Sequence, residues 1–324
     1  MTVESADRVV SRPYRDESDW QGIRALLIRA RGRVAHGEVW DVRHWDGWRY
    51  HRSRPRTDAQ MAACIGVWET QEGRIVGAVH PESGGDAFIE LDPSFRRLEA
   101  EMIAWAEDHL PSPRDARGMS RLQFWVADDA ETRRGLLSDF GYQIGEPGGW
   151  LRCLRFGTPD EPESPDEIGS GPLSTETELP EPYRLRTTQP SESDCARMAA
   201  LLNSAFGVST HTAREIHNFV DRSPSFEHEL NLVAVAPDES FAATVGVTYD
   251  AENRHGIIEP VCTHPAHRLS GLARCLLNEG LRRLAARGAR TASLDAGEGE
   301  AANALYIACG FVEGHHFRPW RREL

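Results

Sequence analysis

The sequence lacks lysine altogether, so its 37 basic residues are all arginines, and 50 aspartates and glutamates outnumber them. The net charge of −13 leaves no excess of positive charge with which to hold a nucleic acid. No apolar run approaches the length of a membrane span, and residues 1–8 lack the apolar core of a signal peptide. These absences predict a cytoplasmic protein that binds neither nucleic acid nor membrane.

Cysteine is also sparse, because the six residues are scattered along the chain with no Cys-x-x-Cys spacing. Neither a zinc site nor a disulfide framework is indicated, and isolated thiols are typical of a reducing compartment. His36, His44 and His51 lack the spacing of metal ligands. We therefore expect no metal, and we interpret residues 34–54, which are rich in Trp and His, as a helical surface element.

One segment divides the chain into two halves. Residues 158–182 contain eight acids, six prolines and no base. This composition is typical of an extended linker that is stiffened by charge. We expect a domain over residues 1–157 and another over residues 183–324, each long enough for a core of its own.

The two halves repeat one order of predicted strands and helices. Gly77 and Gly246 are 169 residues apart, as are Gly141 and Gly310. The segments Asp-Pro-Ser-Phe-Arg at 92–96 and His-Pro-Ala-His-Arg at 264–268 are 172 residues apart. A repeat of this length predicts a tandem duplication of one mixed α/β unit, because solenoid repeats are far shorter.

Residues 257–286 are the most informative stretch. Residues 257–262 form an apolar run typical of a buried strand, a polar loop follows to residue 271, and leucines then recur at helical spacing. A strand–loop–helix unit points backbone N–H groups and the positive end of the helix dipole at the loop. Gly271 permits close approach to the backbone, and Arg268 adds a fixed positive charge. The stretch therefore predicts a pyrophosphate site.

This pattern, written Arg268-x-x-Gly271-x-Ala273, resembles the acyl-CoA pyrophosphate loop of the GNAT superfamily of N-acetyltransferases. Downstream, Asn303-x-x-Tyr306 with a following Gly-Phe is similar to the last conserved block of that family. The resemblance is complete over residues 183–324 and only architectural over residues 1–156. It implies two tandem GNAT domains of the α/β class, each with a mixed, mostly antiparallel sheet that splays at its central parallel strand pair.

The resemblance also implies a site for acetyl-CoA as co-substrate. Backbone groups of Val261, Cys262 and Thr263 would bind the pantetheine arm, and the Asn303 side chain would bond to the same arm. The pyrophosphate would be held by the backbone amides of His267, Arg268, Leu269, Ser270, Gly271, Leu272 and Ala273.

Two catalytic residues follow from the same resemblance. Tyr306 would be the general acid for the sulfur of CoA, and Glu259 the general base, commonly through water. As alternative bases His264, His315 and His316 stay open, since a histidine titrates near neutrality. The cysteines at 262 and 309 are expected to be buried apolar residues rather than nucleophiles, which favours direct transfer.

We therefore predict an N-acetyltransferase that acts on the primary amine of a small molecule, as a monomer or homodimer. A non-catalytic acyl-CoA-binding sensor or scaffold, and an enzyme acting on a protein or peptide amine, are the alternatives. Acidic side chains at 215, 221, 227 and 229 would suit a cationic amine, or they form a solvated helix face. The acceptor pocket is expected from the first two helices and the terminal strands, at Phe206, His211, His217, Phe219, Phe226, His228, His315, Phe317 and Trp320.

The two halves are not expected to be chemically equal. The 172-residue offset places Glu99 where Gly271 lies and Glu101 where Ala273 lies. A carboxylate about 4 Å from a phosphate charge is repelled by roughly 4 kcal/mol at an effective dielectric constant of 20. We therefore expect one CoA site per chain, in the C-terminal half.

Overall fold

The computed structural model describes residues 8–34, 37–157 and 177–324, so most of the expected linker and His36 lie outside the described residues. Contacts between Cα atoms divide the chain into two compact units. Unit 1 consists of Met1–Val42, Arg56–Gly149 and His315–Leu324, and unit 2 of Arg43–Pro55 and Trp150–Gly314. Among the described residues, no helix is both long and apolar enough to cross a membrane.

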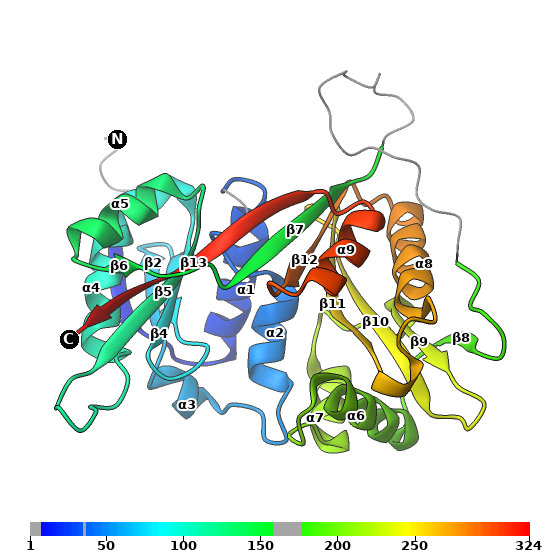
Figure 1. Cartoon of the computed structure of the whole chain (residues 1–324). Helices are drawn as coiled ribbons and strands as arrows, with labels where there is room; N and C mark the ends of the chain where they lie inside the picture. Colours follow the sequence, from blue (N-terminus) through cyan, green and yellow to red (C-terminus); the bar gives the residue numbers. More distant parts are fainter. Residues whose placement is uncertain (1–7, 35–36, 158–176) are drawn as a thin grey trace. The chain divides into compact units, whose positions relative to one another are not determined.

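Unit 1 is a mixed sheet with helices on its faces (Figure 1). Its strands follow the order β1-β2-β3-β4-β5-β13, with the short β6 on β13. All neighbours are antiparallel except β4 and β5, which are parallel. The elements are β1 (Val9–Pro13), α1 (Glu17–Arg31), α3 (Asp58–Ala62), β2 (Gly66–Thr70), β3 (Ile75–His80), β4 (Asp86–Leu91), α4 (Glu99–His109), β5 (Arg121–Ala127), α5 (Glu131–Asp139), β6 (Gln143–Ile144) and β13 (Glu313–Glu323).

Unit 2 repeats this plan with the strand order β8-β9-β10-β11-β12-β7. Here β11 and β12 are the parallel pair, and the other neighbours are antiparallel. The elements are α2 (Val42–Tyr50), β7 (Gly149–Arg155), β8 (Arg184–Thr187), α6 (Glu192–Phe206), α7 (Ala213–Arg222), β9 (Asn231–Val235), β10 (Phe241–Asp250), β11 (His255–Thr263), α8 (Leu272–Ala286), β12 (Thr291–Ala296) and α9 (Glu300–Ala308).

The α/β class and the tandem mixed-sheet architecture are thus confirmed. Helix α6 begins where the sequence predicts it, with the Ser191 hydroxyl accepting the Asp194 N–H at 3.2 Å, and it ends at Gly207 in a left-handed conformation. The two units also share the splay of the sheet. The register of each parallel pair ends at Ile257 with Ser293 in unit 2, and at Ala87 with Phe124 in unit 1.

The last strand of each sheet comes from the other half of the sequence. Strand β7, which the sequence assigns to the first domain, pairs with β12 in unit 2 from Trp150 to Arg155. Strand β13, the final strand of the chain, pairs with β5 in unit 1. The compact units therefore differ from the continuous segments expected at 1–157 and 183–324.

The sheet of unit 2 separates two apolar layers. On one face, α8 and α9 bury Leu276, Leu281 and Tyr306 against the strands. On the opposite face, α6 and α7 bury Cys195 and Ile216 against β9, β10 and β11. A sheet that is covered on both faces explains why β10 is buried at almost every position.

The segment rich in Trp and His is not a surface element. Trp45 is fully buried and stacks on Trp48, with ring centroids 5.7 Å apart. Both belong to α2, which the contacts assign to unit 2. The expectation failed because the burial of this helix depends on contacts distant in sequence, which local composition does not encode.

Candidate active site

The loop between β11 and α8 leaves a run of backbone amides bare. The N–H groups of His267 and Arg268 are used inside a 3-10 turn, bonding to the carbonyls of His264 and Pro265. The next five amides, at 269–273, have no acceptor among the described residues. Helix α8 has neither a side-chain cap nor an acidic residue in its first turn. The helix start therefore presents free donors and the positive dipole end, as an anion site requires.

Gly271 provides the turn that exposes these amides. Its φ is +75°, and a Cβ at this position would meet nothing within 4 Å. A side chain here would thus extend into open space in front of the helix start. The Arg268 guanidinium lies beside this loop, where it donates to the carbonyls of Ala205 at 2.9 Å and Thr263 at 3.4 Å.

The open side of β11 adjoins the same loop. Strand β11 continues to Thr263 after its register with β12 ends at Ile257, and it is paired on its other side with β10. A bulge in β10 places Gly246 against the Glu259 carbonyl, where a Cβ would lie 2.3 Å from that oxygen. Only glycine fits there. Among the described residues, the edge of β11 at Val261–Thr263 that faces away from β10 has no strand partner, so it can pair with an extended ligand.

Tyr306 lies in α9 with 7 % of its surface exposed. Its hydroxyl has no hydrogen-bond partner among the described residues. Burial raises the pKa of Tyr306, and the nearby thiols of Cys262 and Cys309 act in the same direction. The phenol therefore keeps its proton at neutral pH.

The side chain of Asn303 forms hydrogen bonds within the protein. Its amide donates to the carbonyls of Gly297 at 2.8 Å and Gly299 at 2.9 Å, while its oxygen accepts from Arg152 Nε at 2.5 Å. Here Asn303 orders the loop before α9, and its contact with the pantetheine arm stays a prediction.

Glu259 is half exposed beside a buried arginine. The side chain of Glu259 is 53 % exposed, and its Oε2 lies 3.9 Å from Nη1 of Arg43, whose side chain is 8 % exposed. Arg43 also lies over the ring of Phe219, 4.2 Å from the centroid. Sequence reasoning missed Arg43, because no motif links α2 to the strand that carries Glu259.

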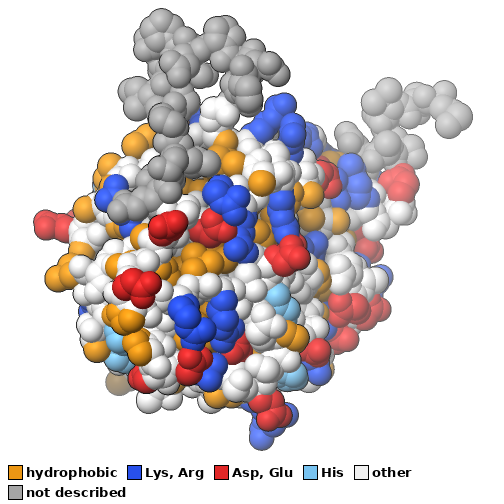
Figure 2. All heavy atoms as spheres, turned by 90° about the vertical axis from the view of Figure 1, so that its right-hand side faces the viewer, with side chains coloured by type: hydrophobic (Ala, Val, Ile, Leu, Met, Phe, Trp, Pro, Cys, Tyr) orange, Lys and Arg blue, Asp and Glu red, His pale blue; other side chains and the backbone are white. Residues whose placement is uncertain are grey.

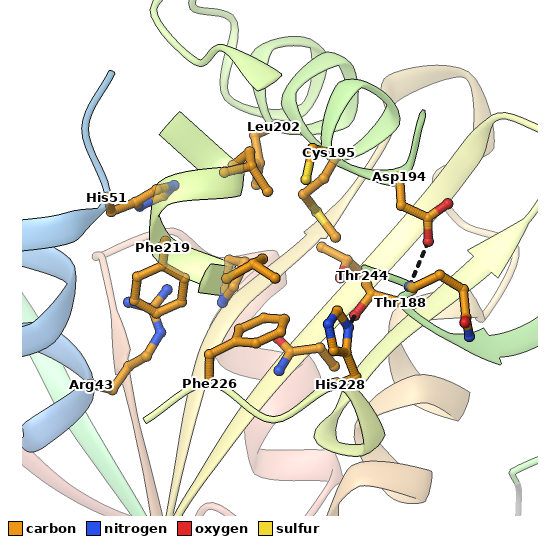
Figure 3. Close-up of a pocket in the computed structure, with 16 residues that line it drawn as sticks. Arg43, His51, Thr188, Asp194, Cys195, Leu202, Phe219, Phe226, His228 and Thr244 are labelled. Carbon is orange, nitrogen blue, oxygen red and sulfur yellow. Dashed lines mark hydrogen bonds between the residues drawn. The ribbon is translucent and has the colours of Figure 1, made fainter. Parts of the chain in front are cut away.

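A pocket opens in front of Arg43, between β10, β11 and the helices α6 and α7 (Figure 3). It encloses about 530 Å³ of empty space, its open mouth included. The lining is mostly apolar, and its main apolar side chains are Met198, Leu202, Ile216, Phe219, Val220 and Phe226. Such a lining, apolar with a few polar groups, is typical of small-molecule sites.

The pocket retains only part of the acceptor site expected from sequence. Phe219, Phe226 and His228 line it, whereas Phe206 is 55 % exposed. The expected contributions of the terminal strand are wrong for this pocket, because Phe317 and Trp320 pack in the core of unit 1. Likewise Glu227 and Glu229 pair with Arg287, so they supply no free carboxylate for a cationic acceptor.

A polar cluster adjoins the pocket at the end of α2. Glu215 Oε1 lies 3.0 Å from His211 Nδ1 and 3.3 Å from His51 Nε2. Burial lowers the pKa of His51 to about 3, and Arg43 and His211 add to the effect, so His51 is neutral at physiological pH. One ligand atom of each of the three lies within 4.8 Å of the others, so this cluster could hold a metal ion. Without a metal ion, Glu215 is hydrogen-bonded to His211 and in close contact with His51.

In unit 1 the corresponding helix start is filled by protein. Glu99, the first residue of α4, is fully buried and accepts from Arg133 Nε and, at 3.2 Å, from Arg96 Nη1. Burial by itself would raise the pKa of Glu99, but Arg133 and Arg96 together lower it. Arg133 also donates to the Ile89 carbonyl at 3.3 Å, on the part of β4 beyond its register with β5.

The positions where α4 and α8 begin correct the residue-by-residue correspondence that was expected between the two units. Both α4 and α8 begin one residue after an uncapped position, which is Leu98 in unit 1 and Gly271 in unit 2. Glu99 therefore corresponds to Leu272 and Glu101 to Arg274, one residue off the 172-residue offset. Helices α5 and α9 keep the 169-residue offset, which places Leu137 at the position of Tyr306.

Charges of both signs lie on the face of the molecule shown in Figure 2. On the face shown in Figure 2, arginine side chains alternate with carboxylates, and neither sign dominates. This face offers no extended basic surface to a nucleic acid.

Known proteins share this architecture. Residues 196–311 match the model of the acetyltransferase (GNAT) family. A GCN5-related N-acetyltransferase from Sphaerobacter thermophilus is 20% identical with a TM-score of 0.60, over 98% of this chain and 96% of that one. A tandem GNAT protein from the clavulanic acid biosynthesis pathway is 16% identical with a TM-score of 0.61, over 98% of both chains. A GNAT-family acetyltransferase from Colwellia psychrerythraea is 11% identical with a TM-score of 0.59, over 97% and 99%. The sequence has no significant match among curated proteins.

The open strand pair, the uncapped helix start and the family match together define an acyltransferase. Residues 196–311 match the GNAT family, and the whole chain shares its fold with a tandem GNAT protein, with unit 1 repeating the architecture of unit 2.

Proposed function

We propose that unit 2 binds acetyl-CoA, the donor that the GNAT family uses, and transfers its acetyl group to the primary amine of a small molecule. The observation that carries this proposal is the free edge of β11 running into five unbonded amides at 269–273. An extended pantetheine arm would pair with the edge at Val261–Thr263. The pyrophosphate would accept hydrogen bonds from the amides.

Transfer is direct in this proposal. Glu259 takes a proton from the ammonium through water, and the amine nitrogen then attacks the thioester carbonyl. The N–C bond forms, the C–S bond breaks, and the leaving sulfur takes the phenolic proton of Tyr306. The second proton of the nitrogen then returns to the Tyr306 phenolate, and Glu259 releases the first proton to solvent. A covalent route through Cys262 is disfavoured, because burial raises the pKa of its thiol to about 12.

The test is acetylation by the full chain. Purified protein is incubated with labelled acetyl-CoA and a small-molecule metabolite extract or a panel of primary amines, and thiol release and product mass are followed. Labelled acetyl amides above the level of a protein-free control support the proposal. Tight CoA binding with no labelled product indicates a sensor instead, and label transferred only to added peptides indicates the peptide alternative.

A further inference from the structure

Arg43 is a buried cation whose donors form no hydrogen bond with any described residue. Its side chain is only 8 % exposed. The contact with Glu259 is 3.9 Å long, which is beyond hydrogen-bond length, and the contact with Phe219 is to a ring face. A guanidinium carries five N–H donors, and the nitrogens of Arg43 are not sealed from solvent, so a ligand that enters the pocket can reach them. The arrangement indicates that a ligand supplies the missing acceptor.

The other charge in the pocket is already satisfied. Asp194 accepts two bonds from Arg186, at 2.7 and 2.8 Å, and one from the Gln189 N–H at 2.8 Å. Within the part of the chain that the structure describes, Arg43 is therefore the cation that this apolar lining offers to a ligand. Figure 3 shows the Arg43 side chain directed at Phe219 on the pocket wall.

We propose that Arg43 binds the carboxylate of the acceptor, and that the acceptor is an α-amino acid with an apolar side chain. This inference rests on the proposed function, because it takes Glu259 as the group beside the reacting amine. Arg43 and Glu259 are adjacent and of opposite charge, which complements an ammonium and a carboxylate on one carbon. The apolar side chain of the amino acid would contact Met198, Leu202 and Phe226.

The reaction would yield an N-acetyl amino acid and CoA. The carboxylate takes no part in bond making, so Arg43 acts in binding and orientation. Its planar fork suits a carboxylate better than the single ammonium of a lysine would. An amide or a decarboxylated amine has the same nucleophile but gives Arg43 no anion to bind.

Calorimetry on the full chain saturated with CoA tests the subsite without turnover. The probes are leucine, methionine and phenylalanine, each with its amide and its decarboxylated amine. We expect at least one acid to bind roughly 10- to 100-fold tighter than its two neutral-end analogues. Equal binding within every series, or no binding of any acid, overturns the proposal.

Variants sharpen the same measurement. Arg43→Gln should remove the preference for the acid, and Arg43→Lys should keep part of it. The control Arg222→Gln removes a positive charge from an exposed position on α7 and should keep the full preference. Retained CoA binding in each variant establishes that unit 2 is folded. A preference that persists in folded Arg43→Gln overturns the proposal.

Turnover then separates this inference from the proposed function. Selective binding of an acid without acetyl transfer supports the Arg43 subsite and contradicts the proposed function. Transfer to amides and simple amines as fast as to the acids supports the proposed function and overturns the subsite.

Discussion

The two units have the same sheet topology, but they differ at the place where the central parallel strands separate. In unit 2 the helix start beside the opening has Gly271 with a φ of +75° and bare amides after it. In unit 1 the same helix start holds the fully buried Glu99, which is paired with Arg133 and Arg96. The difference teaches that a helix N-terminus can be satisfied by an internal carboxylate as well as by a bound anion.

The second difference lies on the helix that follows. Unit 2 places the Tyr306 phenol on α9, whereas unit 1 has the fully buried Leu137 at the corresponding place on α5. Arg133 on α5 further bonds to the Ile89 carbonyl of β4. Unit 1 therefore keeps the packing of the fold, but a buried ion pair occupies its helix start and a buried leucine takes the place of the tyrosine. We expect CoA to bind once per chain, in unit 2.

The largest expected effect comes from adding a carboxylate immediately before the helix start of unit 2. Gly271→Glu should abolish CoA binding, because a side chain at this position extends into the open space before the bare amides. Calorimetry with CoA measures the loss. Gly271→Gln, with equal bulk and backbone strain but no charge, should bind CoA more tightly than Gly271→Glu does.

A control for strain lies in unit 1. Gly118 also has a positive φ, of +81°, and a Cβ added there would meet nothing within 4 Å. Gly118→Glu should leave CoA binding unchanged. A stoichiometry near two CoA per chain in the unmodified protein, or unaltered binding in Gly271→Glu, would contradict the asymmetry of the units.

The next effect is on turnover. Tyr306→Phe should keep CoA affinity and lower kcat by roughly 10²- to 10⁴-fold, the contribution of a positioned general acid. The pKa of Tyr306 is raised from its ordinary value of 10.0, so activity should show no loss from this group as the pH rises toward 10. Steady-state kinetics across about pH 6–10 check both points.

The control removes a phenol elsewhere in unit 2. Tyr249 donates to the Arg287 carbonyl at 3.0 Å, away from the proposed chemistry. Tyr249→Phe should cost stability but not kcat. Equal values of kcat for Tyr306→Phe and the unmodified chain would remove the acid role.

In unit 1 the corresponding change acts on stability. Glu99→Gln leaves the buried Arg133 without its counter-charge, which should lower the free energy of unfolding by about 3–5 kcal/mol. The folded pKa of Glu99 lies below its ordinary value of 4.5, so its ionised form stabilises the fold above pH 4.5. That contribution is lost as the pH falls through the lower, folded pKa.

Urea unfolding at about pH 7 and at several values below about pH 5 measures the gap between the variant and the unmodified chain. The gap should be full at neutral pH and shrink toward acid. Glu101→Gln is the control, since Glu101 accepts only one bond among the described residues, from Trp68 Nε1 at 2.7 Å, and should cost about 1 kcal/mol. A gap that is constant with pH would show that Glu99 is not ionised in the fold.

Much of this contrast could be predicted from sequence, because it depends on local patterns. The apolar run, the polar loop and the leucine spacing of residues 257–286 describe one continuous strand–loop–helix segment. The two glutamates at 99 and 101 likewise mark a helix start by themselves. Their exact equivalents are off by one residue, since the 3-10 turn before α4 is longer than the one before α8.

What depends on contacts between distant segments could not be predicted. Strands β7 and β13 each join the sheet of the other half of the chain. The sequence of either strand cannot predict this, because a strand can pair with any sheet edge whose hydrophobic pattern matches its own. Arg43 is 216 residues from Glu259 in sequence. The engagement of Asn303 by Arg152 also required the position of β7 to be known.

The smallest expected effect compares the two arginines of the matching segments at 92–96 and 264–268. Arg268 borders the bare amides, and its guanidinium already bonds to exposed carbonyls that a phosphate can replace. Arg268→Ala should weaken CoA binding by roughly 1.5–3 kcal/mol, the scale of one charge-assisted hydrogen bond. Arg96 instead pairs with Glu38 and Glu99 inside unit 1. Arg96→Ala should therefore lower stability and leave the CoA dissociation constant unchanged.

Calorimetry of both variants at two salt concentrations tests this comparison. Only the unmodified chain and Arg96→Ala should retain the full salt dependence of a phosphate contact. Equal weakening by the two substitutions would mean that unit 1 takes part in binding CoA.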